Sequence, residues 1–341
     1  MADKNIIIGS GFSAHMHHIL SSEPYLHYGV TNGNFLFRKK LDRTIEFECN
    51  KIFSKKSFSF GKLRLNSKFI KLHDRLIDGG NSKIWGGFFD ITNIPKSIIN
   101  KMKINGILLK RMSLNATGSY SNFPNIFQLQ NCNGSIYDFS ENRFEIKNSY
   151  LNRISIDNNK IILYFYSDVG CDEEQIIYAD KAVLAIGTIQ LLNVLYNSDY
   201  LKDGDNISLE EYKMEYALGP RFTKDSTSIY YTFIRALNHY LGIRKNFNIL
   251  KFRLIEQKFT IQKNIIHFRI DKNEILPFNN AKFGNSIHYC NLNINNVDIN
   301  HFLKSLNPNL IGIGMPFVKQ LKPGPISNDI VLDIAKKINY L

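Results

Sequence analysis

Residues 5–20 read NIIIGSGFSAHMHHIL and place two glycines directly after a short apolar run. Gly9, Gly11 and Ala14 fit the pattern G-x-G-x-x-A, in which the first glycine permits a tight strand-to-helix turn and the second lets a pyrophosphate approach the backbone. The small third residue allows close packing of helix and strand. A helix beginning near Ser13 would direct free N–H groups and its positive dipole end at phosphates. We therefore expect a nucleotide-binding turn here.

Two further glycine segments could approach the same ligand. Residues 78–90, DGGNSKIWGGFFD, carry four glycines around the only tryptophan of the chain, and a surface loop anchored by Trp85 is the competing interpretation. Residues 181–192, KAVLAIGTIQLL, predict a buried strand followed by a helix that opens at Gly187 and Thr188. This second turn could also direct N–H groups at a cofactor.

Other kinds of reactive site are not indicated. His15, His17 and His18 form an H-x-H-H tract, but no carboxylate is near enough in sequence to complete a metal site, and no metal is expected. His15 could instead approach the cofactor. No G-x-S-x-G elbow occurs, which argues against a serine nucleophile. The four cysteines are widely spaced without a C-x-x-C pair, which argues against a zinc site and a disulfide framework.

Composition describes a folded, basic chain. Its 341 residues are 44% hydrophobic and 13% aromatic, enough for one large domain or two ordinary ones. The net charge of +13 could attract nucleic acid, anionic lipid or phosphorylated substrates. The lysines are scattered and no DNA-binding motif occurs, so no nucleic-acid partner is expected. No signal peptide or transmembrane stretch is recognised, and we expect a cytoplasmic protein.

The elements that would position these turns follow from local patterns. LHYGV, residues 26–30, predicts a second strand, although the acidic residue that usually binds ribose after it is missing and Asn32 stands there instead. The run ISIDNNKIILYFY predicts a hairpin that turns at Asn158 and Asn159, and QIIYA could add a third strand. These elements indicate an α/β protein with a mainly parallel sheet and a β-meander.

The three glycine segments together resemble the FAD-dependent oxidoreductases of the glucose–methanol–choline family. GSGFSA at 9–14, GGNSKIWGG at 79–87 and AVLAIGTIQLL at 182–192 occur in that family's order. There the first turn binds the FAD pyrophosphate, the second segment wraps the cofactor near the flavin, and the third is a strand leading into a helix. The resemblance implies FAD rather than NAD. In an NAD(P)-dependent dehydrogenase, the alternative, GGNSKIWGG would have no role.

The resemblance also assigns cofactor contacts. It places the strand near residues 146–151 against the adenine and the loop before the last helix beside the flavin. The residues implied to bind FAD are Gly9, Gly11, Phe12, Ser13, Ala14, Asn32, Gly79, Gly80, Asn81, Ser82, Trp85, Gly86, Gly87, Leu151, Ala185, Gly187, Thr188, Gly324 and Pro325.

Alcohol oxidation needs a base that takes the hydroxyl proton while a hydride leaves carbon for the flavin N5. Histidine suits this role because its pKa lies near neutrality. The resemblance implies His288 as the base, against the competing interpretations of a buried structural or a surface histidine. Asn328 is the nearest candidate for the second catalytic group. It is displaced, since the family's usual Asp falls at Gly314 and its usual Asn near Pro325.

The resemblance implies a Rossmann-type FAD-binding domain with a β-meander and a smaller, discontinuous α+β substrate domain. We assign residues 1–95, 140–204 and 286–341 to the first, and residues 96–139 and 205–285 to the second, substrate or cap domain.

The expected function is FAD-dependent oxidation of a hydroxyl carbon, or the reverse reduction, on a polar small molecule. A sugar or nucleotide-sugar suits the family and the basic surface, and surface-polysaccharide biosynthesis is the analogous pathway. The electron acceptor is left open. The alternative is a protein with the FAD fold but without alcohol-oxidising activity, which acts as a binding or assembly subunit.

Overall fold

The structure is a computed structural model. It describes residues 4–31, 58–60, 63–65, 88–111, 126–134, 137, 139, 144–166, 174–218, 257–272, 274–277, 289–320 and 326–340.

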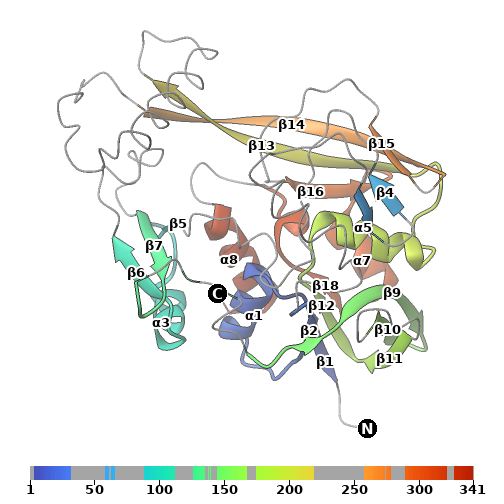
Figure 1. The fold of residues 1–341 in the computed structure, drawn as a ribbon, viewed down its shortest axis with the longest axis horizontal. Coiled ribbons are helices and arrows are strands. Elements are labelled where there is room, and N and C mark those ends of the chain that lie inside the picture. The colour runs from blue at the N-terminus through green and yellow to red at the C-terminus, as the bar shows by residue number, and fades with distance from the viewer. Residues whose placement is uncertain are drawn as a thin grey trace.

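Five parallel strands form the central sheet (Figure 1). In order across the sheet they are β18 (Leu310–Gly312), β12 (Lys181–Leu184), β1 (Asn5–Ile8), β2 (Leu26–Gly29) and β8 (Lys147–Asn148). All four neighbouring pairs are parallel. The chain leaves β1 toward β2 and β8, then returns to β12 on the other side of β1. The strand order therefore reverses between β1 and β12, and the expected α/β class with a parallel sheet is confirmed.

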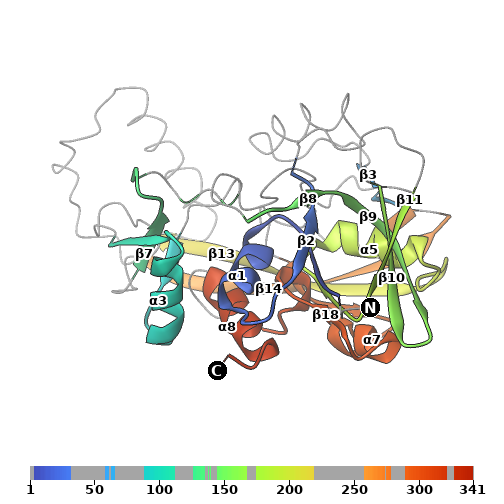
Figure 2. The same cartoon turned by 90° about the horizontal axis from the view of Figure 1, so that it is seen from below.

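The sheet is buried on both faces, which explains its uninterrupted apolar strands. Ile6 and Ile8 pack into one core together with helix α5 (Thr188–Asn197). Ile7 points to the other core, which it shares with α1 (Phe12–Leu20) and α8 (Ile326–Lys337). Figure 2 shows α1 and α8 on one side of β2 and α5 on the other.

An antiparallel meander connects β8 to β12. It consists of β9 (Tyr150–Asp157), β10 (Lys160–Tyr166) and β11 (Glu174–Ala179). Asn158 and Asn159 join β9 to β10 with φ of 46° and 63°. Two consecutive positive φ angles are typical of a type I′ turn, which matches the twist of a hairpin. The predicted hairpin, third strand and following β12–α5 unit are confirmed.

A second, larger sheet covers the core and crosses the top of Figure 1. Its order is β17 (Val297–Asp298), β16 (Tyr289–Ile294), β13 (Asn206–Leu218), β14 (Gln257–Asp271), β15 (Glu274–Pro277), β4 (Leu63–Leu65) and β3 (Phe58–Phe60). The hairpin of β13 and β14 forms its centre. β16 pairs with β13, so this sheet runs across the boundary assigned at residue 286.

A small third sheet lies at one end of the molecule. Its order is β5 (Phe88–Asp90), β7 (Ile126–Gln130) and β6 (Leu108–Arg111), with helix α3 (Lys96–Ile104) packed beside it. β5 pairs with β7 and so joins segments that were assigned to different domains.

Helix α7 (Ile299–Leu306) and the short 3-10 helix η3 (Met315–Phe317) flank β18. Within the described ranges, every helix is too short or too polar to cross a membrane.

Candidate functional site

The candidate site lies where β1, β12 and β18 end together. Ile8 is in register with Leu184, and Leu184 with Gly312. Beyond the strands the alignment continues, because Ala185 N donates to Ile8 O at 2.7 Å and Ile313 N donates to Leu184 O at 2.9 Å. In open parallel sheets, ligands bind outside the carboxyl ends of the strands, at the point where the strand order reverses. This edge of the sheet meets both conditions.

Gly9 is required by the closeness of the neighbouring chain. Its φ is 137°, which L side chains rarely adopt, and a Cβ there would lie 2.3 Å from Ala185 O. Gly29, at the end of β2, has a similar constraint, since its Cβ would lie 2.7 Å from Gly9 O. The first predicted turn therefore passes between the backbone at Ala185 and the backbone at Gly29. Neither Gly9 nor Gly29 has room for a side chain. Gly29 was not among the predicted site residues, although a glycine at a strand end is a signal of close approach.

The two turns carry helix N-termini whose caps are glycines. Gly11 caps α1 and Gly187 caps α5, and neither helix has a side-chain cap or an acidic residue in its first turn. By contrast, Asp298 caps α7 by accepting bonds from Asn300 N and His301 N. Helix N-termini without a carboxylate of their own favour an external anion such as a phosphate. Phe12, Ser13 and Ala14 lie in the first turn of α1 and Thr188 begins α5, and their contacts with a cofactor stay a prediction.

Gly314 brings the third strand end to the first helix. Its φ is 98°, and a Cβ there would lie 2.7 Å from Ser13 Oγ. The sequence interpretation treated this position only as the place of a missing acid. The structure puts it against the N-terminal turn of α1, so its lack of a side chain is what lets the β18 loop come close.

Four buried or half-buried histidines lie on α1 and β2, namely His15, His17, His18 and His27. His27 on β2 contacts Gly9 O through Nε2 at 2.6 Å, and because a carbonyl only accepts, Nε2 carries the proton. Burial lowers the pKa of His27 to about 4, and the bond to Gly9 opposes this shift. Burial likewise lowers the pKa of His15 to about 3 and of His17 to about 4, and Lys181 adds to the effect at His17. All three are therefore neutral at pH 7.

His15 packs among aromatic side chains. Its Nε2 lies 3.2 Å from Tyr137 OH, and its ring packs edge-on against Phe139 with centroids 5.0 Å apart. The ring of His18 stacks on the ring of Phe144, with the two ring centroids 3.3 Å apart. The tract is thus part of the α1 packing, and no group of metal-ligating side chains occurs among the residues described.

The end of β2 meets β8 at the flank of the site. Thr31 N donates to Asn148 Oδ1 at 3.0 Å, and Ser149 N donates to Gly29 O at 3.0 Å. The segment predicted to face adenine thus borders the first turn. Leu151, three residues farther along, has its side chain fully buried in the core, so any cofactor contact would come from its backbone.

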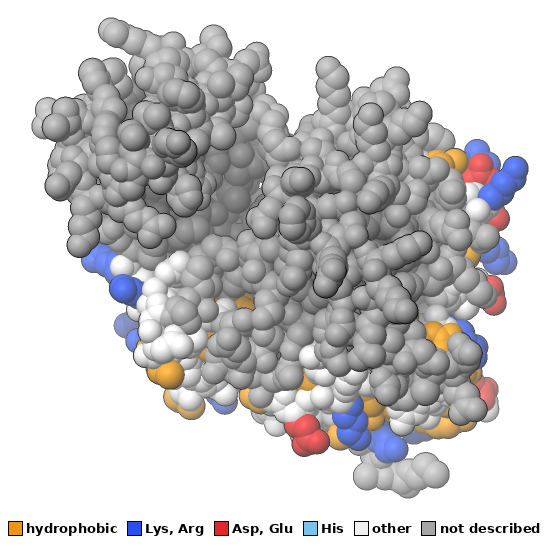
Figure 3. Space-filling view, viewed as in Figure 1, with side chains coloured by type: hydrophobic (Ala, Val, Ile, Leu, Met, Phe, Trp, Pro, Cys, Tyr) orange, Lys and Arg blue, Asp and Glu red, His pale blue; other side chains and the backbone are white. Residues whose placement is uncertain are grey.

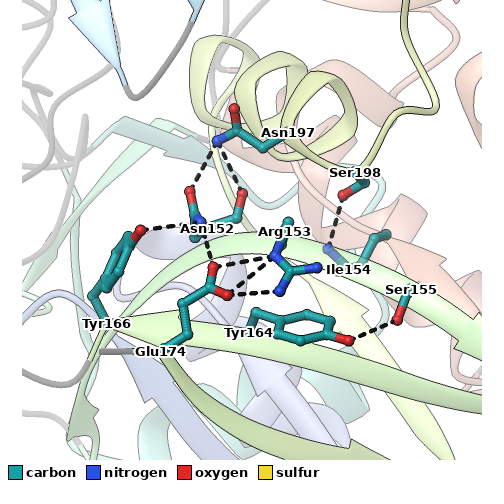
Figure 4. Close-up of polar contacts among 9 residues, drawn as sticks. All are labelled: Asn152, Arg153, Ile154, Ser155, Tyr164, Tyr166, Glu174, Asn197 and Ser198. Atoms are coloured by element: carbon teal, nitrogen blue, oxygen red, sulfur yellow. Dashed lines mark hydrogen bonds and ion pairs between the residues drawn. The ribbon is translucent and has the colours of Figure 1, made fainter. Parts of the chain in front are cut away.

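Polar contacts fix the far end of α5 to the meander (Figure 4). Ile154 N donates to Ser198 Oγ at 2.8 Å, and Asn197 Nδ2 donates to Asn152 Oδ1 at 2.9 Å. Asn152 in turn donates to Glu174 on β11. These bonds hold α5 in place and so help to set the position of its N-terminus at Gly187.

Asn328 lies in the first turn of α8 and is bonded to a backbone. Asp90 N donates to its Oδ1 at 3.0 Å, and its Nδ2 donates to Asp90 O. Both ends of the amide therefore join α8 to the end of β5. The catalytic role assigned to Asn328 stays a prediction. The other predicted site residues lie outside the described ranges: Asn32, Gly79, Gly80, Asn81, Ser82, Trp85, Gly86, Gly87, His288, Gly324 and Pro325.

No family model matches this sequence, and no curated protein is detectably similar to it. Among solved structures, the chain is similar to one described as a protoporphyrinogen oxidase from Exiguobacterium sp. 255-15, with 9% identity, a TM-score of 0.31, and coverage of 100% of this chain and 98% of that one. A flavoprotein/dehydrogenase from Cytophaga hutchinsonii gives 10% identity and a TM-score of 0.26 over 84% of this chain and 73% of that one.

A third similar structure, AlpK, gives 12% identity and a TM-score of 0.20 over 65% of this chain and 39% of that one. At such TM-scores and identities, none of the three likenesses transfers a function to this chain. The case for a cofactor therefore depends on the chain's own strand ends.

Proposed function

We propose that the chain binds FAD where β1, β12 and β18 end, and that it is an oxidoreductase. The observation that carries the proposal is the pair of glycine contacts at Gly9 and Gly314, which draw three strand ends together where the strand order reverses. The backbone N–H groups from Gly11 to Ala14 would hold the pyrophosphate. The segment around Asn148 would border the adenosine. FAD held there would supply the hydride acceptor.

The finer proposal concerns the substrate and the base. His288 takes the hydroxyl proton of a polar, sugar-like alcohol, and Asn328 assists it. The net charge of +13 supports a substrate with phosphate groups, such as a nucleotide-sugar. The bonds between Asn328 and the Asp90 backbone hold its amide at the end of β5.

A second candidate function is an FAD-binding subunit without alcohol oxidation. It is favoured by Gly314, which stands at the family's usual Asp position, and by the engagement of both ends of the Asn328 amide. Such a protein would bind FAD at the same strand ends but would not be reduced by alcohols.

The first test is the visible absorption spectrum of the purified protein, before and after heat release of any ligand. Two oxidised-flavin bands and a released species with the mass of FAD are the expected result. A colourless protein that also fails to take up added FAD would overturn the proposal. For a flavin-loaded protein, anaerobic addition of sugar alcohols and nucleotide-sugars separates the two functions, because only the enzyme is bleached.

A further inference from the structure

Helix α3, strand β6 and the turn between them carry only one sign of charge. Residues 96–111 read KSIINKMKINGILLKR and contain no acidic residue. The basic residues, all exposed, are Lys96, Lys101, Lys103, Lys110 and Arg111. We call this surface the α3–β6 basic face. None of its four lysines pairs with a carboxylate in the part of the chain that the structure describes.

The same face exposes apolar side chains. Ile104 is 81% exposed, the highest value for a large apolar residue within the described ranges, and Leu108 is 44% exposed. Ile98 and Met102 are fully buried and define the inner side of α3. With 3.6 residues per turn, Ile104 then lies on the outer side, between Lys101 and Lys103. Figure 3 shows basic and apolar side chains together along the lower left edge, where Figure 1 draws β6 and α3.

Local helix physics explains only part of this pattern. Lys101 and Lys103 lie in the last turn of α3, where cations interact well with the helix dipole. Lys96 is the first residue of the helix, where the dipole disfavours a cation. Leu108 and Lys110 are on β6, outside the helix altogether. A shared partner accounts for all of them better than helix stability does.

We propose that the α3–β6 basic face docks on an anionic lipid surface. The lysines complement the negative headgroups, and Ile104, with Leu108 beyond the turn, enters the boundary between headgroups and acyl chains. Nucleic acid would use the lysines but not Ile104, and residues 96–111 contain no aromatic side chain on which a base could stack. The face lies on the opposite side of α1 from the β9–β11 meander (Figures 1 and 2). None of the residues assigned to the flavin site lies in 96–111, so the proposal does not rest on that site.

The test is co-sedimentation of the full chain with phosphatidylcholine vesicles that contain about one-third phosphatidylglycerol, at about 0.1 M salt. The expected result is binding to these vesicles and little binding to pure phosphatidylcholine. Each lysine near the surface strengthens binding about fivefold, so Lys101→Gln with Lys103→Gln should weaken it about 25-fold. The matched control is Lys202→Gln with Lys272→Gln, which removes two exposed charges elsewhere and should change binding little.

Apolar insertion has its own control pair. Ile104→Ser should weaken vesicle binding, and Ile265→Ser, which alters a 54% exposed isoleucine on β14, should not. Since all of these side chains are exposed, unfolding temperatures should stay unchanged. Three results would overturn the proposal: no binding to anionic vesicles, equal losses in a test variant and its control, or binding to a single-stranded oligonucleotide alone. A chain that binds vesicles but no FAD would refute only the proposed function.

Discussion

Replacement of Gly314 by alanine should weaken FAD binding while leaving the chain folded. The new Cβ would lie 2.7 Å from Ser13 Oγ, about 0.7 Å inside ordinary contact at 3.4 Å. The φ of 98° also disfavours alanine, by about 1–3 kcal/mol. In the free protein we expect the β18 loop to move away from α1. This movement relieves the close contact with Ser13 Oγ and lets residue 314 leave its unfavourable φ. Binding of FAD requires the loop to return, so the strain appears in the dissociation constant as a loss of about 5–150-fold.

The control is Gly134→Ala. Gly134 has a φ of 83°, but a Cβ there has no atom within 4 Å. It therefore suffers comparable backbone strain without a close contact, and its unfolding temperature should fall while FAD affinity stays unchanged. In the double variant Ser13→Ala with Gly314→Ala, the nearest atom becomes the Cβ of residue 13 at 3.3 Å, so affinity should partly recover.

Fluorescence titration of the apoprotein with FAD measures all three variants, and thermal unfolding confirms that each is folded. A folded Gly314→Ala protein with the wild-type dissociation constant would refute the placement of FAD at this loop. An equal loss of affinity in Gly134→Ala would show that backbone strain anywhere in the chain is enough.

The remaining predictions concern catalysis, pH and a buried ion pair. His288→Ala should keep bound flavin but lower substrate-driven reduction about 10²-fold or more, and unchanged stopped-flow kinetics would remove His288 from the mechanism. Because burial lowers the pKa of His15, His17 and His27 below the usual 6.5, the unfolded chain binds more protons between about pH 4 and 6.5. Stability should therefore be full above pH 6.5 and fall as the pH drops, by up to about 1.4 kcal/mol per pH unit for each histidine, and a flat unfolding temperature from pH 7 to 5 would contradict this. Lys337→Met should destabilise the fold by about 3 kcal/mol, because it removes the partner 2.8 Å from the largely buried Asp333 carboxylate and the bond to Gly312 O. Adding Asp333→Leu should recover part of that loss in denaturant unfolding, whereas no recovery would assign the loss to the bonds that Lys337 donates to Gly312 O and Asn300 Oδ1.

The sequence predicted the elements whose signals are local. The apolar run before Gly9, the Asn158–Asn159 turn and the strand before Gly187 each specify an element within about ten residues, and all three are confirmed. The contacts between distant segments were not predictable in this way. Gly314 meets Ser13, and His27 meets Gly9, only after β18 and β2 have taken their places in the sheet. Asn328 shows the same limit, because its Asp90 partner lies 238 positions away.

Two features of the strand ends lower the stability of the fold: uncapped helices and glycines in place of larger residues. A side-chain cap contributes about 1 kcal/mol to a helix, and α7 obtains one from Asp298, whereas α1 and α5 begin at glycines and α3 follows Pro95, all three without such a cap. Gly9 and Gly314 lie at the same edge, where a Cβ at Gly9 would meet the backbone of Ala185 and a Cβ at Gly314 would meet the Ser13 hydroxyl. Packing alone explains the missing Cβ atoms but not the missing caps on both adjacent helices. An anion that receives N–H groups from both turns would account for the two together, which supports the proposal that the pyrophosphate of a dinucleotide binds at this edge.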